Sequence, residues 1–248
     1  MNGCIHPECY EFDPGCSDGA ALLWLNRTPS ETLLPETLPV DGAELWLKGS
    51  DAYVNGSLFL WENANGDGRY ATADSAHAPT IIDMNSQKIV DFDGVDDYLN
   101  LYIPVAASLT LFIVYSPSVA DAYVFQGTGT NNSPAFLSDA GNGDYYFYLT
   151  PDGCQLADGV SGLNTASVIH VDGGNYSGFF NGAATCPSVA ATVNTAGLIV
   201  NGIGGGTAFD GEIGEFIIYN RELSVPERES VECYLSEKYS IAVAHACS

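Results

Sequence analysis

Residues 108–117, SLTLFIVYSP, decide the class of fold. Apolar side chains fill both sets of alternate positions: Leu111 and Ile113 belong to one set, Phe112 and Val114 to the other. Successive side chains of a strand point to opposite faces, so a strand made of these residues is apolar on both faces. Such a strand is buried between two layers of structure. The stretch therefore predicts a layered fold with this run in the middle.

Other short runs rich in strand-forming residues lie on either side of this one, separated by Gly, Asn and Asp turns. They are residues 43–49, 57–63, 88–92, 98–104, 122–127, 144–150, 166–172, 176–182, 197–203 and 211–220. In the run 98–104, Leu99, Leu101 and Ile103 share one face. Many short strands joined by tight turns predict an all-β, two-sheet antiparallel sandwich.

One helix is expected close to the end of the chain. Ser224 and Glu227 have the spacing of a capping box, and Pro226 falls in the first turn, where proline is tolerated. Its apolar stripe consists of Val231, Tyr234, Leu235 and Tyr239. Its charged face consists of Glu229, Glu232 and Glu237, which we expect to face solvent. The helix is predicted to pack on one sheet or to close one end of it.

The composition is that of a globular, strongly acidic protein. The chain has 248 residues, 46% of them hydrophobic, and 31 acidic residues against 7 basic ones give a formal net charge of -24. A protein of this charge is repelled by nucleic acid and by anionic membrane surfaces, so neither is an expected partner. No apolar run approaches the roughly 20 residues of a membrane helix, and no signal peptide is visible. The acidity itself fits either solubility or divalent-cation binding.

The first 42 residues differ from the rest of the chain. They contain five prolines and little apolar periodicity, which is typical of an extended arm rather than of a domain with its own core. We expect an N-terminal arm at residues 1–42, a sandwich at residues 43–241 and a short tail at residues 242–248. The arm is predicted to anchor the protein or to hold neighbouring subunits of a larger assembly.

Seven cysteines cannot all pair within one chain. The spacing of the first three, with His6 nearby, does not match the short Cys-x-x-Cys pairs of structural zinc sites, so disulfides are favoured over zinc. The candidates for disulfides are Cys154, Cys186, Cys233 and Cys247. The candidates for contacts between subunits are Cys4, Cys9 and Cys16.

The segment FDGVDDYLNL, residues 92–101, gathers three carboxylates around Gly94. Asp93, Asp96 and Asp97 can hold a metal ion, act as acid and base, or stabilise a turn by accepting hydrogen bonds from nearby backbone amides. We favour the turn.

Four segments together resemble a known family. They are LWLKG (45–49), WENANGDGRYA (61–71), VDFDGVDDYLNL (90–101) and FDGEIGEFIIYNRELSVPERESVECYLSEKYSI (209–241). Their order is similar to that of laminin-G-like domains, which belong to the concanavalin A-like lectin/glucanase superfamily and also occur in phage structural proteins. The resemblance covers residues 43–241 and implies a two-sheet jelly roll of about a dozen strands. It also implies that FDGVDDYLNL is a strand–turn–strand signature.

Calcium is the only cofactor that the sequence indicates. Asn63, Asn65, Asp67 and Gly68 follow the 1, 3, 5, 6 spacing of oxygen-ligand loops, and Asp74 stands at position 12. Two of the first three ligands are neutral, and position 12 is not the usual glutamate. The same residues also fit a plain Asn/Gly turn, so both interpretations stay open.

The sequence shows no recognisable catalytic motif. In Asp210-Gly-Glu212-Ile-Gly-Glu215 the two glutamates are three residues apart, which puts them on opposite faces of a regular strand, unlike the paired carboxylates of glycosidases. No nucleophile elbow is present. We therefore expect the protein not to be an enzyme.

Glycan binding would need an exposed aromatic ring with polar groups around it. The sequence offers the run 145–148, Trp46 and Trp61, without indicating which ring is exposed. The function that we expect is a non-catalytic structural or adhesion module on a virion or an extracellular surface, with glycan or host-surface attachment. The alternatives are a soluble or cell-surface lectin and a glycan hydrolase with an unrecognised site.

Overall fold

The computed structural model describes residues 36–101, 103–106, 108–118, 123–127, 135–139, 144–148, 154–157, 162–171, 174–190, 198–203 and 209–247. The chain divides into two units, Met1–Thr37 and Leu38–Ser248, and the fold is that of the second. Cys4, Cys9 and Cys16 lie outside the described residues. No helix in the described part of the chain is long and apolar enough to cross a membrane. The predicted boundary at residues 42 and 43 stays a prediction.

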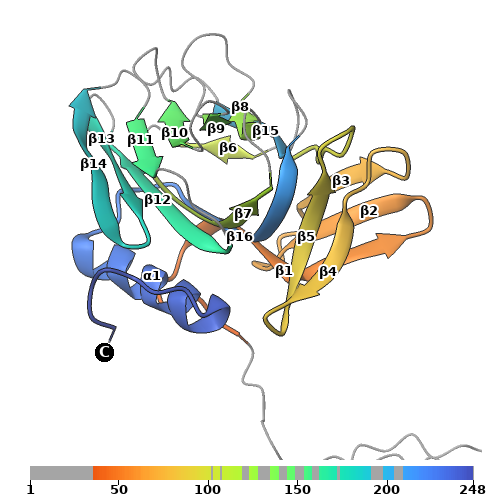
Figure 1. Ribbon diagram of the computed structural model, residues 1–248, viewed down its shortest axis with the longest axis horizontal. Helices are drawn as coiled ribbons and strands as arrows, with labels where there is room; N and C mark the ends of the chain where they lie inside the picture. The colour runs from red at the N-terminus through yellow and green to blue at the C-terminus, as the bar shows by residue number, and fades with distance from the viewer. Residues whose placement is uncertain are drawn as a thin grey trace, which may run out of the picture. The chain divides into compact units, whose positions relative to one another are not determined.

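The described strands form two antiparallel sheets (Figure 1). The larger sheet has the order β14 (Ala183–Ala190), β13 (Asn175–Phe180), β12 (Asn164–His170), β7 (Leu109–Pro117), β16 (Asp210–Tyr219), β1 (Ala43–Asn55), β2 (Leu58–Asn63) and β3 (Tyr70–Asp74). In addition, β5 (Gln87–Asp93) pairs with β16 and with β4 (Thr80–Met84). The smaller sheet has the order β11 (Cys154–Ala157), β10 (Asp144–Tyr148), β9 (Ala135–Asp139), β8 (Tyr123–Gly127), β15 (Leu198–Ile203) and β6 (Pro104–Val105).

Strand β7, formed by the run 108–117, lies in the middle of a three-layer arrangement, as its sequence predicted. Leu111 and Ile113 belong to a core that also contains Phe125 of β8 in the smaller sheet. Phe112 and Val114 point the other way, into a second core shared with the C-terminal helix. Figure 1 shows that helix on one side of β7, β12 and β16 and the smaller sheet on the other. The prediction of an all-β sandwich with one C-terminal helix is confirmed.

Helix α1 (Val225–Tyr239) begins at the predicted capping box. The Glu227 carboxylate accepts hydrogen bonds from the backbone N–H and the hydroxyl of Ser224, at 2.9 and 2.8 Å. The guanidinium of Arg221 also donates to it, at 2.8 Å. These bonds lower the pKa of Glu227 to about 2, the Arg221 bond having the largest effect. The helix start is therefore fixed by its own sequence.

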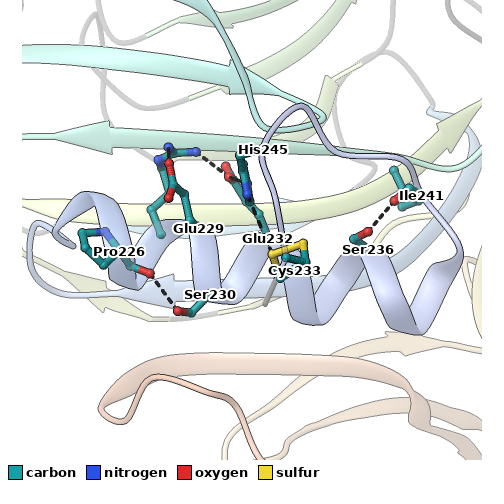
Figure 2. The surroundings of a disulfide bond; sticks show 10 residues. Pro226, Glu229, Ser230, Glu232, Cys233, Ser236, Ile241 and His245 are labelled. Carbon is teal, nitrogen blue, oxygen red and sulfur yellow. Dashed lines mark hydrogen bonds and ion pairs between the residues drawn. A yellow bond between two sulfur atoms is a disulfide. The ribbon is translucent and has the colours of Figure 1, made fainter.

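The expectation that Glu232 faces solvent is wrong, because this side chain is only 1% exposed. It lies under the helix, where Ser167 of β12 donates to it at 2.6 Å and Arg228 forms an ion pair with it. His245, in the tail after the helix, lies 2.8 Å from the same carboxylate. Figure 2 shows His245 beside Glu232. A buried carboxylate needs such partners. Helical spacing alone cannot reveal Ser167 and His245 as partners, since these two residues come from other elements.

The four disulfide candidates pair as Cys154–Cys186 and Cys233–Cys247. The first bond joins β11 of the smaller sheet to β14 of the larger one, and so links the two layers at one end. The second ties the C-terminal tail to α1 beside His245 (Figure 2). The prediction of disulfides is confirmed.

Several strands differ from the predicted runs. In the described part of the run 98–104, Asn100 forms an isolated bridge with Thr72, with backbone hydrogen bonds of 2.8 and 2.9 Å, and Pro104 begins the short β6. Pro104 has no N–H to continue a ladder. The strands β3, β4, β9, β11 and β14 have no counterpart among the predicted runs. Their sequences are short or rich in alanine and polar residues, so pairing rather than propensity makes them strands.

The acidic turn of FDGVDDYLNL has the structure that its sequence favoured. Gly94 has a φ of 72°, a conformation that glycine adopts readily. Asp93 accepts a hydrogen bond from the backbone N–H of Val95 at 2.8 Å, and Asp97 accepts one from the N–H of Asp93 at 2.9 Å. The carboxylate oxygens of Asp93, Asp96 and Asp97 come within 4.8 Å of one another. Backbone hydrogen bonding to their carboxylates accounts for Asp93 and Asp97.

Candidate functional site

The outer face of β1, β2 and β3 carries two exposed aromatic rings with a carboxylate between them. Tyr53 of β1 is 39% exposed and Tyr70 of β3 is 50% exposed. Glu62 of β2 is exposed and lies directly opposite Tyr70 in the antiparallel pair. The hydroxyl of Tyr53 donates to Glu62 at 2.7 Å, which fixes the ring beside the carboxylate. This hydrogen bond also raises the pKa of Tyr53.

The opposite face of the same strands explains why these three side chains point outward. Phe59, Trp61 and Ala71 alternate with them and are fully buried in the core between the sheets. Trp61 also donates from its ring N–H to the carbonyl of Lys48 at 2.6 Å. The alternation of a strand then leaves Glu62 and Tyr70 on the solvent side.

The loop between β2 and β3 is held by its own polar side chains. Asn63 is buried; its amide donates to Asp67 at 2.9 Å, and its carbonyl oxygen accepts from the backbone N–H of Trp46 at 2.9 Å. Arg69 donates from Nε to Asp67 at 2.6 Å and from Nη1 to Glu44 at 2.6 Å. Partial burial would raise the pKa of Asp67, but the hydrogen bonds from Arg69 outweigh it, so that pKa is lowered.

A hollow of about 220 Å³ opens between this loop and the ring of Tyr70. Its lining is Glu62, Asn63, Gly66, Gly68, Arg69 and Tyr70. The hollow is smaller than the roughly 300–1,000 Å³ of sites that enclose a drug-sized ligand. It therefore suits a small polar unit that lies against the surface, such as one ring of a longer chain. We call Tyr53, Glu62, Tyr70 and this hollow the tyrosine face.

Two larger grooves have a different character. One, of about 460 Å³, lies at the far end of the β1–β2 hairpin and includes the exposed Val54 and Leu58. The other, of about 510 Å³, lies between β13 and the start of α1 and includes the exposed Val225. Neither lining combines an exposed aromatic ring with a carboxylate beside it: the first has no carboxylate, and in the second Phe179 is half-buried.

The predicted calcium ligands are only partly brought together. Asn63 and Asp67 are hydrogen-bonded to each other, whereas the amide of Asn65 donates to the carbonyl of Ala43 at 2.5 Å. Asp74 lies at the other end of the hairpin, paired with Leu58. At about 3.3 Å per residue, it is roughly 13 Å along the strand from the loop. Calcium ligands lie within about 2.6 Å of the ion, so a single ion cannot collect Asp74 with the others. A calcium site limited to the loop remains one of the two interpretations that the sequence left open.

Asp74 has a separate role in its own turn. Its carboxylate accepts a hydrogen bond from the backbone N–H of Ala76 at 3.0 Å and contacts the ring of His77 at 2.8 Å. These bonds, that of His77 first, lower the pKa of Asp74. A second group of potential ligands, Cys233, His245 and Cys247, surrounds the tail. Its sulfurs are bonded to each other and do not offer the thiolates that zinc binds.

The two glutamates of β16 lie on the same side of the sheet, contrary to the expectation for a regular strand. A bulge between Ile213 and Glu215 adds one residue and reverses the alternation. Glu212 lies opposite Asp91 of β5, and burial raises the pKa of both. Glu215 is 1% exposed and binds α1. The expectation that Glu212 and Glu215 point to opposite faces is therefore wrong.

The two tryptophans named from the sequence are not exposed. Trp46 and Trp61 are both buried, and Trp46 donates from its ring to Glu215 at 2.5 Å. The run 145–148 forms β10, but its side chains lie outside the described residues. Tyr53 was missed because β1 continues six residues past the predicted run, to Asn55. The alternation of strand faces over residues 59–62 was the one sequence signal that Glu62 faces solvent.

Comparison with known proteins identifies the type of fold. No protein family matches it, and no curated protein matches it. Among solved structures it is similar to Trypanosoma rangeli sialidase in complex with sialic acid: 17% identity, TM-score 0.59, covering 82% of this chain and 34% of that one. It is also similar to domain 4 of AbnA, a GH43 extracellular arabinanase from Geobacillus stearothermophilus, in complex with arabinotriose: 13% identity, TM-score 0.53, covering 77% and 97%.

A third similar structure is the ligand binding domain of botulinum neurotoxin serotype D in complex with N-acetylneuraminic acid: 10% identity, TM-score 0.54, covering 77% of this chain and 50% of that one. The chain spans about a third of the sialidase and half of the toxin fragment. At these identities the likeness establishes the fold. It is a β-sandwich fold found in proteins that have been solved with bound sugars.

The expectation that the protein is not an enzyme is corrected by the same comparison. The fold occurs in sialidases and in a GH43 arabinanase, which are glycosidases. The absence of a paired-carboxylate motif on one strand therefore does not exclude that the chain is part of a glycosidase. The bulge in β16 also puts Glu212 and Glu215 on one side of the sheet, which the sequence pattern had excluded.

Proposed function

We propose that the protein binds carbohydrate through the tyrosine face. The observation that carries the proposal is the juxtaposition of Tyr53, Glu62 and Tyr70 on three neighbouring strands, with both rings exposed and the carboxylate fixed between them. Large exposed rings on a rigid sheet are the groups that lose least conformational freedom when a ligand binds. The similar structures with bound arabinotriose and sialic acid support the same class of ligand.

The chemistry of the face suits a sugar. The apolar face of a sugar ring can lie on a tyrosine ring, while its hydroxyl groups donate to a carboxylate. Glu62 accepts one hydrogen bond from Tyr53, and a carboxylate has about four lone-pair directions, so acceptor capacity remains. Gly66 and Gly68 line the hollow without side chains, which brings the backbone within reach of a ligand.

The finer family assignment is part of the proposal. The segments that resemble laminin-G-like domains meet in one sheet. β1 and β5 both pair with the same edge of β16, β5 with its first half and β1 with its second half. Trp46 of the first segment lies opposite Ile217 of the last. Segments distant in sequence but adjacent in space support a shared fold of that family.

The extracellular setting is also proposed. Two disulfides are typical of proteins from oxidising compartments. Display on a virion, and docking of residues 1–42 on neighbouring subunits, rest on the sequence alone. Mass spectrometry of purified particles from the native source would test both.

A glycan array with the purified protein tests the proposal. We expect binding to one class of oligosaccharide and its loss in Tyr70→Ala. Leu58→Ala is the matched control, because Leu58 is 47% exposed on the same hairpin but outside the tyrosine face. Retained binding in Tyr70→Ala, or loss in Leu58→Ala alone, would place the site elsewhere. Release of reducing sugars, measured on the same glycans, tests hydrolysis separately.

A further inference from the structure

The cationic side chains of the sandwich are few, and each is already paired with a carboxylate. Resting on the proposed function, we propose that the tyrosine face selects neutral oligosaccharides and rejects sialylated or otherwise acidic ones. The inference concerns the class of ligand, on which the similar structures divide: one binds a neutral trisaccharide and two bind sialic acid.

The sequence limits the number of groups that could bind an acidic sugar. The chain has 7 lysines and arginines, and only Arg27 precedes the sandwich. The other six all lie in the described part of the chain, so no undescribed loop of the sandwich contributes another. Their carboxylate partners are Asp51 for Lys48, Glu44 and Asp67 for Arg69, Asp83 for Lys88, Glu227 for Arg221, Glu232 for Arg228, and Glu215 for Lys238.

Arg69 is the one cation that lines the hollow, and its guanidinium is engaged on every nitrogen. Nε donates to Asp67 and Nη1 to Glu44, each at 2.6 Å, while Nη2 donates to the carbonyl of Glu44 at 2.9 Å. Nη2 also contacts the Asp67 carboxylate. A sialic acid carboxylate would have to displace one of these charge-assisted hydrogen bonds, which are about twice as strong as neutral ones. The loop structure depends on the same bonds.

The electrostatic potential around the hollow also disfavours acidic ligands. Glu62 contributes a negative charge at the tyrosine face itself, and the protein as a whole carries a formal net charge of -24. Both repel an anionic ligand, and the long-range part weakens as salt rises. A neutral sugar meets no such penalty, since its hydroxyl groups donate to the carboxylate.

A matched pair of ligands tests the inference. Lactose and 3′-sialyllactose differ by one acidic sugar; arabinotriose and laminaritriose extend the neutral set. We expect calorimetry to show that sialyllactose binds at least tenfold more weakly than the best neutral trisaccharide. Sialyllactose should also bind no more tightly than lactose. In Asp67→Asn, which frees part of Arg69, the ratio between the acidic and neutral ligands should move toward one.

The other possible results distinguish between a wrong selectivity, a wrong site and a wrong proposed function. Sialyllactose bound more tightly than the neutral sugars, and lost in Tyr70→Ala, would overturn the neutral selectivity while leaving carbohydrate binding at the tyrosine face intact. Binding that is indifferent to Tyr70→Ala would overturn the site. No binding to any ligand of an array would overturn the proposed function, and the inference with it.

Discussion

Replacing Glu215 by glutamine should destabilise the protein strongly, because this carboxylate joins the sheet to the helix. It is 1% exposed on β16, and Lys238 of α1 donates to it at 2.7 Å. Tyr234 and Tyr239 donate to it at 3.0 Å each, and Trp46 donates from β1. Glutamine keeps one acceptor oxygen but removes the charge that balances Lys238, whose side chain is 10% exposed.

The magnitude follows from the burial of both partners. Removing one member of a buried ion pair costs about 3–5 kcal/mol, because the other charge stays buried without compensation. A surface pair is worth about 0–1 kcal/mol. Lys88 and Asp83 form such a pair, 49% and 71% exposed, so Asp83→Asn is the control. We expect Glu215→Gln to cost about 3 kcal/mol and Asp83→Asn less than about 1 kcal/mol.

Urea unfolding followed by tryptophan fluorescence measures both free energies, since Trp46 contacts Glu215 directly. A double-mutant cycle with Lys238→Met separates the lost charge balance from the lost hydrogen bonds. The double variant should recover at least about 1 kcal/mol relative to Glu215→Gln. A cost within about 0.5 kcal/mol, the range of ordinary surface substitutions, would refute the buried pair.

Three further predictions concern pH, disulfides and calcium. Burial raises the folded-state pKa of Asp91 above its unfolded value of about 3.9, so its favourable contribution is complete below that pH and is lost as pH rises through the folded pKa. Asp91→Asn should therefore be more stable than the native protein at pH 7 and equal to it at pH 3 in thermal melts, whereas the exposed Glu237→Gln should show no such trend. Serine in place of Cys154 and Cys186, which are 32 residues apart, should lower the free energy of unfolding by about 3–4 kcal/mol; a change under about 1 kcal/mol would argue against the bond. Excess calcium should leave the melting temperature unchanged, because both oxygens of Asp67 already accept hydrogen bonds from Arg69 or Asn63. A rise that Asp67→Ala abolishes would instead establish the loop as a calcium site.

The sequence was informative wherever a local pattern decides structure. Ile113 and Phe112 point into different cores, as their alternation predicted, because a strand buried on both faces has a distinct sequence. Ser224 and Glu227 start the helix, because a capping box acts within one turn. The turn at Gly94 followed from its own residues in the same way.

It was uninformative wherever a distant partner decides structure. Glu232 has the spacing of a solvent-facing residue, but it is buried against Ser167 of β12 and His245 of the tail, which its own helix does not reveal. The bulge that reverses Glu215 arises from pairing with β7, which a single strand does not reveal. Gly49 shows the same limit: a Cβ there would lie 1.9 Å from the carbonyl oxygen of Lys88, a constraint set by β5.

The tyrosine face required the fold for a similar reason. Tyr53, Glu62 and Tyr70 come from three strands, and only the sheet order β1-β2-β3 places them side by side. The sequence supplied many aromatic residues, and burial removed Trp46 and Trp61 from consideration.

The dissociation constant of one bound oligosaccharide, measured by calorimetry for the native protein and for Tyr70→Ala, tests the central claim most directly. The tyrosine ring is 50% exposed, so its removal should leave the melting temperature unchanged while removing the surface on which the sugar lies. We predict about tenfold weaker binding in Tyr70→Ala, which corresponds to about 1.4 kcal/mol, and unchanged binding in Leu58→Ala. An unchanged dissociation constant in Tyr70→Ala, with the protein folded, would contradict the account.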